Sequence, residues 1–157
     1  MGVSAPICIL VSKIMKKIAI SACLLGEKCR YDATDNRDEN ILAKLKGHEL
    51  IPFCPEDHAF GSPRPTMDLI QTEQGIKAIS NKTNTDLSFA IEGYAKAFFN
   101  KHTQIDLFIG KDRSPSCGVC SAKLYDSDRE LISSKEAGLM AKEALERGIV
   151  SVDAEAY

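Results

Sequence analysis

Three of the six cysteines in this chain stand beside glycine or proline turns, in the sequences CLLG (Cys23), CP (Cys54) and SPSCG (Cys117). Thiolates bind soft metals, so three of them at one point would attract zinc or an iron–sulfur cluster. Structural zinc usually takes four ligands from CxxC pairs, whereas Cys23 and Cys29 are six positions apart. A four-iron cluster usually takes four cysteines. With three, one iron keeps an open position at which a substrate sulfur could bind.

The sequence Cys117-Gly-Val-Cys120 leaves a second chemistry open, because it is a CxxC pair. Such pairs act in thiol redox reactions when the thiolate lies at a helix N-terminus near a βαβ unit. Here the pair comes late in the chain, and the next residues, SAKLYDS, are not typical of the start of a long helix. The alternatives are therefore a thiol redox or sulfur-carrier protein and a non-enzymatic metal-binding module.

A regular alternation of strands and helices must position these cysteines. Short apolar runs predict strands over residues 17–22, 48–54, 105–110 and 149–152. Helical spacing and N-capping residues predict helices over residues 35–46, 86–102 and 134–147. Residues 68–72 and 76–80 flank Glu-Gln-Gly and predict a hairpin. This order predicts an α/β fold, a three-layer sandwich with a mostly parallel central sheet and a small hairpin insertion.

The predicted topology places the three cysteines at one edge of the sheet. Cys23 follows the first strand, Cys54 ends the second, and Cys117 lies in the loop after the third. Ligands of such sheets bind beyond the carboxyl ends of the strands. A buried cysteine is often only a small apolar side chain. Three of them at the same edge nevertheless favour a shared site.

Composition limits the partners and the location of the protein. With 157 residues the chain is expected to form one domain, over residues 16–157. Its net charge of −2 gives no field for attracting nucleic acid.

Residues 1–15 are expected to be a leader or extension outside the domain. Their apolar stretch is too short to span a membrane, and its lysines follow it, unlike those of a signal peptide. The helix and strand pattern needs no disulfide framework, so we expect a reducing, cytoplasmic setting.

Four motifs together resemble those of one protein family. They are SACLLGEKCRYD (21–32), FCPED (53–57), SPRPTMD (62–68) and RSPSCG (113–118). This set is similar to that of a family long known only as a domain of unknown function, which includes the TudS-type thiouracil desulfidases. The resemblance runs from about residue 16 to the C-terminus. This chain departs from the family pattern at residues 57–60, which replace a glycine-rich stretch, at Asp68, where a glutamate is usual, and at Ala33, where a glycine is usual.

The resemblance implies a Rossmann-like fold, a [4Fe–4S] cluster, and the hydrolytic removal of sulfur from a small-molecule substrate such as a thiopyrimidine, whose sulfur would bind the open iron. It also implies that Cys23, Cys54 and Cys117 are the ligands of the cluster. Glu56 would be the general base, and Ser114 or Ser116 would donate to the substrate ring. Arg30, Tyr31 and Arg64 are expected to contact the substrate. Each of these residues also has an ordinary structural interpretation: Glu56 as an acid in the first turn of a helix, the serines as turn residues and Tyr31 as a core aromatic.

Overall fold

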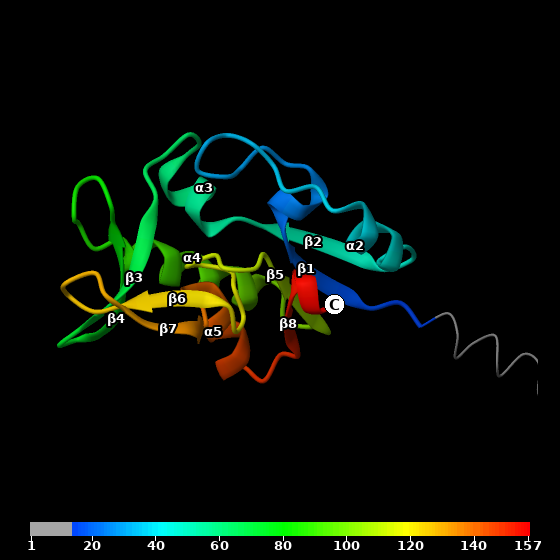
Figure 1. Ribbon diagram of the computed structural model, residues 1–157. Helices are drawn as coiled ribbons and strands as arrows, with labels where there is room; N and C mark the ends of the chain where they lie inside the picture. Colours follow the sequence, from blue (N-terminus) through cyan, green and yellow to red (C-terminus); the bar gives the residue numbers. More distant parts are fainter. Residues whose placement is uncertain (1–13) are drawn as a thin grey trace, which may run out of the picture.

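The computed structural model describes residues 14–157, and the fold contains two four-stranded sheets that lie side by side (Figure 1). Of the expected N-terminal extension, only Ile14 and Met15 fall within the described residues, and both are exposed. The first sheet has the order β2-β1-β5-β8 and the second has the order β4-β3-β6-β7. The structure is thus a mixed α/β fold in which one sheet is entirely parallel.

The parallel sheet is the one predicted from the four apolar runs. Its strands are β1 (Lys17–Ser21), β2 (Glu49–Phe53), β5 (Leu107–Gly110) and β8 (Ser151–Asp153). The side chains of β1 alternate between the two faces of this sheet, because successive residues of a strand point to opposite sides. Ile18 and Ile20 pack on one face, and Ala19 packs on the other.

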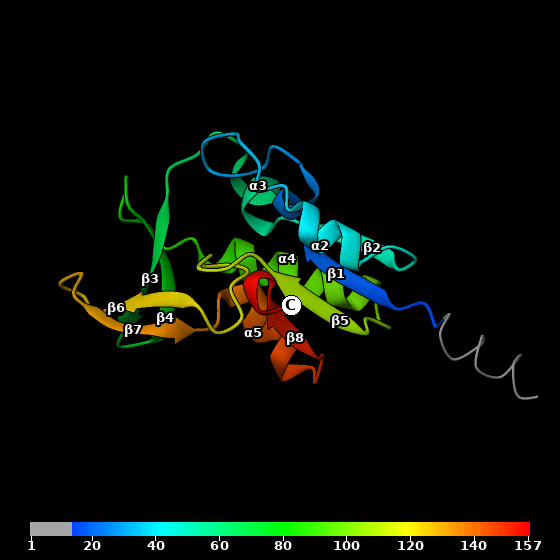
Figure 2. The ribbon, with the colours of Figure 1, turned by 45° about the vertical axis from the view of Figure 1, so that its right-hand side comes forward.

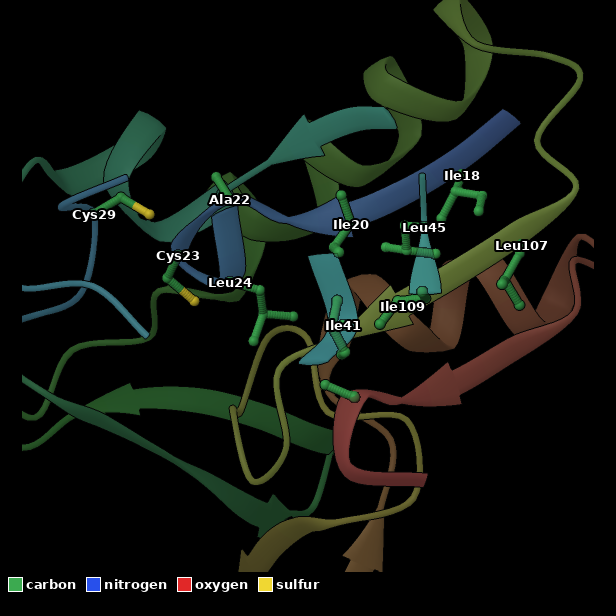
Figure 3. Close-up of a cluster of buried hydrophobic side chains, with 11 residues drawn as sticks. Ile18, Ile20, Ala22, Cys23, Leu24, Cys29, Ile41, Leu45, Leu107 and Ile109 are labelled. Carbon is green, nitrogen blue, oxygen red and sulfur yellow. The ribbon is translucent and has the colours of Figure 1, made fainter. Parts of the chain in front are cut away.

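Helices cover both faces of the parallel sheet. On the face of Ile18 and Ile20 lies α2 (Glu39–Lys44), whose Ile41 is buried in the cluster shown in Figure 3. On the opposite face lie α4 (Ser88–Lys101) and α5 (Leu139–Glu146). There the rings of Phe53 and Phe108 stack with their centroids 4.8 Å apart. Two short 3₁₀ helices, η1 (Ala22–Leu25) and η2 (Ala154–Ala156), follow β1 and β8.

The second sheet is built around the predicted hairpin. Strands β3 (Met67–Thr72) and β4 (Gly75–Ser80) pair in an antiparallel manner, which confirms the hairpin. The strand β6 (Ala122–Tyr125) pairs in parallel with β3, and β7 (Leu131–Glu136) pairs antiparallel to β6. Neither β6 nor β7 was expected from the sequence. The hairpin therefore forms half of a complete sheet, which packs on α4 and α5 through a third core cluster.

The predicted helix over residues 134–147 is wrong in its first part. Ser134 lies in β7 and caps no helix, and α5 begins at Leu139 after Gly138 (Figure 2). The strand β7 is an edge strand and is mostly exposed, so its sequence LISSKE lacks the alternation of apolar and polar residues that indicates a strand. Its serines are also typical N-capping residues, which is why the sequence predicts a helix start there.

The other predicted helices are shorter than expected. The helix α2 begins after Asp38, whose side chain accepts a hydrogen bond from the Ile41 N–H at 3.1 Å. The helix α4 begins after Leu87, and Asp86 accepts from the Ser88 N–H just before it. A further short helix, α3 (Pro55–Phe60), follows β2 directly. No helix among residues 14–157 is long and apolar enough to cross a bilayer.

Candidate active site

A cavity of about 640 Å³ opens between the carboxyl end of the parallel sheet and the second sheet. Its walls include Ser21 and Phe53, the last residues of β1 and β2, and Met67 and Leu69 of β3. The cavity therefore lies at the sheet edge where the sequence predicts a site. Eight of the nine residues predicted for the site line it: Cys23, Cys54, Cys117, Glu56, Ser114, Arg30, Tyr31 and Arg64.

The three predicted ligand cysteines follow three neighbouring strands. Cys23 lies in η1 directly after β1, Cys54 lies between β2 and α3, and Cys117 lies in the loop after β5. Because β2, β1 and β5 are adjacent and parallel, their carboxyl ends bring these cysteines to the same cavity.

The loop that carries Cys117 packs tightly on two glycines. A Cβ atom on Gly110 would lie 1.8 Å from the carbonyl oxygen of Cys117, and one on Gly138 would lie 2.5 Å from the carbonyl carbon of Ser116. Real side chains do not approach backbone atoms so closely. These two positions therefore require glycine, because the loop can reach its place only against a bare backbone.

Cys29 is a fourth thiol at the cavity, and the sequence prediction did not assign it to the site. It lies in the same buried cluster as Cys23, against which Cys54 also packs. This contact is the main cause that brings the pKa of Cys23 down to about 7, and the amide of Asn36 adds to it, while burial opposes it. The pKa of Cys54 is lowered chiefly by the same contact with Cys29. Because the thiolate is the form that binds metal, a lowered pKa suits the ligand role that the sequence predicts for Cys23 and Cys54.

Cys117 and Cys120 lie in very different surroundings. Burial raises the pKa of the Cys117 thiol well above its usual value, and the charges of Cys54 and Glu56 add to this. Cys120 is exposed, does not line the cavity and donates its backbone N–H to Asp153. Redox CxxC pairs need a lowered thiol pKa at a helix N-terminus, and among residues 14–157 no helix begins at Cys117. The pair is therefore not arranged for thioredoxin-like chemistry.

Glu56 connects the first turn of α3 to the Cys117 loop. Its Oε2 accepts a hydrogen bond from the Ser116 hydroxyl at 2.8 Å. Its Oε1 lies 3.5 Å from Nε of Arg64, and both side chains are largely buried, at 14% and 6% exposure. The carboxylate thus lines the cavity with both of its oxygens held by neighbouring side chains.

Arg64 links three segments around the site. Its Nη1 donates to the carbonyl oxygens of Cys29 and Gly61, at 2.9 and 3.1 Å, and to the Ser62 hydroxyl at 2.7 Å. Its Nε is buried without a hydrogen-bond partner. An unsatisfied buried N–H is costly, and the ion pair with Oε1 of Glu56, 3.5 Å away, offsets part of that cost.

The two candidate serines have different surroundings. Ser114 lines the cavity, and its hydroxyl oxygen accepts from the backbone N–H groups of Ser116 and Cys117, at 3.2 and 3.0 Å. Ser116 is completely buried and does not line the cavity, but it contacts Glu56. Ser114 thus faces the cavity and holds the loop of Cys117, whereas Ser116 contacts the carboxylate of Glu56.

Arg30 and Tyr31 form the outer rim of the cavity. Tyr31 is 43% exposed, so it is not a core aromatic. The Arg30 guanidinium lies 5.5 Å from the centre of the Tyr31 ring, and its Nη1 donates to the Thr34 hydroxyl. Both side chains are accessible to a molecule entering from solvent.

Sequence reasoning missed several residues of the site. Asn36 places its Nδ2 3.7 Å from the sulfur of Cys23, and the Tyr94 hydroxyl accepts from the Cys54 N–H at 3.3 Å. Lys111 also lines the cavity and follows β5. Of these, only Lys111 could have been predicted from the sequence, because it directly follows an apolar run and so comes at the carboxyl end of a predicted strand. The second sheet contributes the opposite wall, including Asp68, Asn81, Lys123 and Tyr125.

The arrangement of the cysteines bears on which metal group they fit. Within residues 14–157, no set of three or more His, Cys, Asp or Glu side chains is arranged to hold a single metal ion. A structural zinc site needs four ligands around one ion. In an iron–sulfur cluster the cysteines bind different irons, so their sulfurs stand apart. Cysteines spread around a cavity of this size therefore fit a cluster better than a single ion.

Comparisons with known proteins agree with an iron–sulfur cofactor. The chain is 28% identical to the uncharacterized protein YbbK of Bacillus subtilis (strain 168), over 81% of this chain and 90% of that protein. It resembles the solved structure of a [4Fe-4S]-dependent thiouracil desulfidase, TudS, with a TM-score of 0.70 and 26% identity, over 89% of this chain and 91% of TudS. The model of the 2-thiouracil desulfurase family matches residues 18–156, and this protein belongs to that family.

Proposed function

We propose that this protein is a desulfidase that hydrolytically removes sulfur from a small thiolated molecule, such as a thiopyrimidine. The proposed cofactor is a [4Fe–4S] cluster held by Cys23, Cys54 and Cys117. One observation carries the proposal: three cysteines that follow three adjacent parallel strands line one cavity together with a buried carboxylate. The family and the [4Fe-4S]-dependent structural neighbour support it.

The cluster, when bound, would supply an iron without a protein ligand, a Lewis acid that suits a thiocarbonyl sulfur. The remaining steps belong to side chains of this protein. Glu56 takes a proton from a water molecule, whose oxygen attacks the ring carbon that bears the sulfur. A C–O bond forms and the C–S bond breaks, so a thiocarbonyl and water give a carbonyl and hydrogen sulfide without net oxidation or reduction.

Polar groups around the cavity orient the two reactants. Ser116 holds Oε2 of Glu56 and Arg64 lies 3.5 Å from Oε1, so the carboxylate is fixed in direction when it meets the water. The hydroxyl of Ser114 retains a proton that it can donate to a ring heteroatom, since its oxygen already accepts from the backbone. Arg64, which lines the cavity beside Glu56, would contact a ring carbonyl, while Arg30 and Tyr31 would contact the exposed side of the ring.

The setting of the site supports two further proposals. The parallel sheet with helices on both faces would be a Rossmann-like three-layer core, to which the second sheet is added.

The five cysteines of the described chain are all free. Free thiols and a cluster with an open iron both need a reducing compartment, so we propose a cytoplasmic location.

Iron and sulfide analysis of protein purified without oxygen tests the cofactor. We expect about four irons and four sulfides per chain, the content of a [4Fe–4S] cluster. The loaded protein should convert 2-thiouracil or another thiopyrimidine into the carbonyl product and release sulfide in equal amount. A protein that takes up no iron would overturn the cluster. A fully loaded protein that releases no sulfide from a panel of thiopyrimidines would overturn the thiopyrimidine activity.

Single cysteine variants test the ligand set. Cys23→Ser, Cys54→Ser and Cys117→Ser should each lose most of the iron, because each removes one of three anchors. Cys120→Ser is the matched control and should keep the full iron content, since Cys120 is exposed and outside the cavity. If Cys120→Ser loses iron while Cys54→Ser keeps it, the proposed ligand set is wrong.

A further inference from the structure

The loop that carries Cys117 is closed by a hydrogen bond between its two arms. The loop spans residues 111–121 and connects β5 to β6. The Ser121 hydroxyl oxygen, near the end of the loop, accepts from the backbone N–H of Arg113, near its start, at 2.8 Å. We call the part of the loop where these two residues meet its neck. Cys117 lies in the closed part of the loop beyond the neck.

Asp153, the last residue of β8, anchors the neck to the parallel sheet. Its Oδ1 accepts from the Val119 N–H at 2.7 Å and from the Ser121 hydroxyl at 2.9 Å. Its Oδ2 accepts from the Cys120 N–H at 3.0 Å. The strand β8 pairs with β5, from which the loop departs (Figure 2). The second arm of the loop is therefore tied to the strand beside the one that leads into the loop.

The carboxylate of Asp153 is buried, and its hydrogen bonds all come from the loop. The residue is 5% exposed, and none of the ion pairs among residues 14–157 includes it. A buried carboxylate without a cation is costly unless N–H or O–H groups replace its water. The three donors belong to residues 119–121. The loop is therefore favoured in the conformation that supplies them.

The first arm of the loop is also linked to the end of β8, through Glu155. The Glu155 N–H donates to Oδ1 of Asp112 at 2.8 Å, and its carboxylate pairs with the guanidinium of Arg113 at 2.9 Å. Both side chains of this ion pair are more than half exposed, at 56% and 61%, so the pair contributes little. The buried contacts of Asp153 are therefore the stronger anchor.

We propose that Asp153 is a positioning residue that anchors the loop to β8 and thereby holds Cys117 in place before the cluster binds. This inference rests on the proposed function. The bare backbone of Gly110 leaves room for the loop, and Asp153 adds the bonds that keep it there. A ligand that is already in position does not have to be ordered when the cluster binds, which favours binding. The strand β8 thus contributes to the site although it carries no ligand.

The experiment follows amide hydrogen exchange by NMR in the iron-free protein, and iron content after reconstitution without oxygen. The amides of Cys117 and Gly118 report on the loop, because both donate to Ser114 and neither contacts Asp153. The amides of β5 report on opening of the core. In Asp153→Ala the two loop amides should exchange at least about tenfold faster relative to those of β5, since a single hydrogen bond to a charged group is worth about that factor. Iron content should fall.

Asp153→Asn should give intermediate values of both quantities. The amide oxygen can still accept from Val119 and Ser121, but the amide nitrogen cannot accept from the Cys120 N–H. If Asp153→Ala does not fold, Asp153→Asn is compared with the wild-type protein instead.

Ser88→Ala is the matched control. Ser88 is 2% exposed, and its hydroxyl accepts from the Ala78 N–H at 2.8 Å, outside the loop. This variant should lower the unfolding temperature and leave the relative exchange rate and the iron content unchanged.

Two results would overturn the role of Asp153. One is that the loop amides accelerate only as much as those of β5, as after a general loss of stability. The other is that Asp153→Ala keeps the wild-type iron content or loses no more iron than Ser88→Ala. A wild-type protein that takes up no iron would instead overturn the proposed function, while the exchange rates would still show whether Asp153 anchors the loop.

Discussion

The two carboxylate oxygens of Glu56 are held by different partners. Oε2 accepts from Ser116, and Oε1 lies 3.5 Å from Nε of Arg64. A side chain that served only to stabilise the first turn of α3 would need neither contact, because its charge alone favours the helix N-terminus. The geometry therefore supports a chemical role for Glu56.

Glu56→Gln should separate these two roles. The amide is nearly the same size, so the fold and the iron content should be kept. It cannot take up a proton, so turnover should fall by about 10²–10⁴-fold, the usual contribution of a positioned general base. Steady-state sulfide release measures the turnover, and the iron content shows that the two proteins carry the same amount of cluster.

Asp57→Asn is the matched control, because Asp57 lies in the same first turn but its side chain contacts Ser62. It should lose only about 0.3–1 kcal/mol of stability through the helix dipole and keep its turnover. Near-normal turnover in Glu56→Gln would remove Glu56 from the mechanism. The base would then be sought among the other carboxylates of the site, with Asp68 first because it lines the cavity.

Ser116→Ala and Ser114→Ala should have different effects on turnover and iron content. Ser116→Ala frees one oxygen of Glu56, so turnover should fall while iron content is kept. Ser114→Ala leaves the N–H groups of Ser116 and Cys117 without an acceptor, at a cost of about 1–3 kcal/mol, so the ligand loop should loosen and iron content should fall. Equal iron contents in the two variants would contradict this distinction.

The sequence was sufficient to predict where the three cysteines lie, but not which side chains contact one another around them. Cys23, Cys54 and Cys117 could be placed at one edge because each follows an apolar strand, and strand order limits where such residues meet. The contact between Glu56 and Ser116 joins residues sixty positions apart and depends on how the loop after β5 folds back. No local pattern records such a contact, and the same is true of Cys29 beside Cys54.

At the scale of elements, Gly110 connects the parallel sheet to the site. It ends β5, and the carbonyl of Cys117 occupies the space of a side chain there. Gly110→Ala should push the loop away, with a stability loss of about 1–3 kcal/mol and a clear drop in iron content. Thermal unfolding of the iron-free protein measures the loss of stability, and iron analysis of the loaded protein measures the drop in iron content.

Gly93→Ala is a suitable control for that change. Gly93 lies within α4, and a Cβ atom there would meet nothing within 4 Å. Alanine favours helices, so this variant should gain up to about 1 kcal/mol and keep its iron. Normal iron content in Gly110→Ala would show that the loop does not depend on this contact.

Strands made of apolar runs were predictable, whereas β6 and β7, which mix apolar and polar residues, were not. The core strands β1 and β5 are continuous apolar runs, which is typical of parallel sheets. The strand β7 is an exposed edge with serines and a lysine, so its composition does not distinguish it from a loop or a helix start. The helix α3 has only six residues, too few for a periodic pattern to indicate it.

For the molecule as a whole, residues 1–14 should be dispensable. The first strand starts at Lys17, and Ile14 and Met15 are exposed, so neither packs on the core. A protein that begins at Met15 should show the same unfolding temperature and the same iron content as the full chain. A lower value of either would place part of this segment within the domain.

The cavity has two walls, and each belongs to a different sheet. The proposed ligands and Glu56 follow strands of the parallel sheet, whereas Asp68, Asn81, Lys123 and Tyr125 lie on or beside the second sheet. Substitutions in the second sheet can thus alter which molecule fits without disturbing the residues that assemble the cofactor. The choice of substrate is then free to change while the proposed ligand set stays the same.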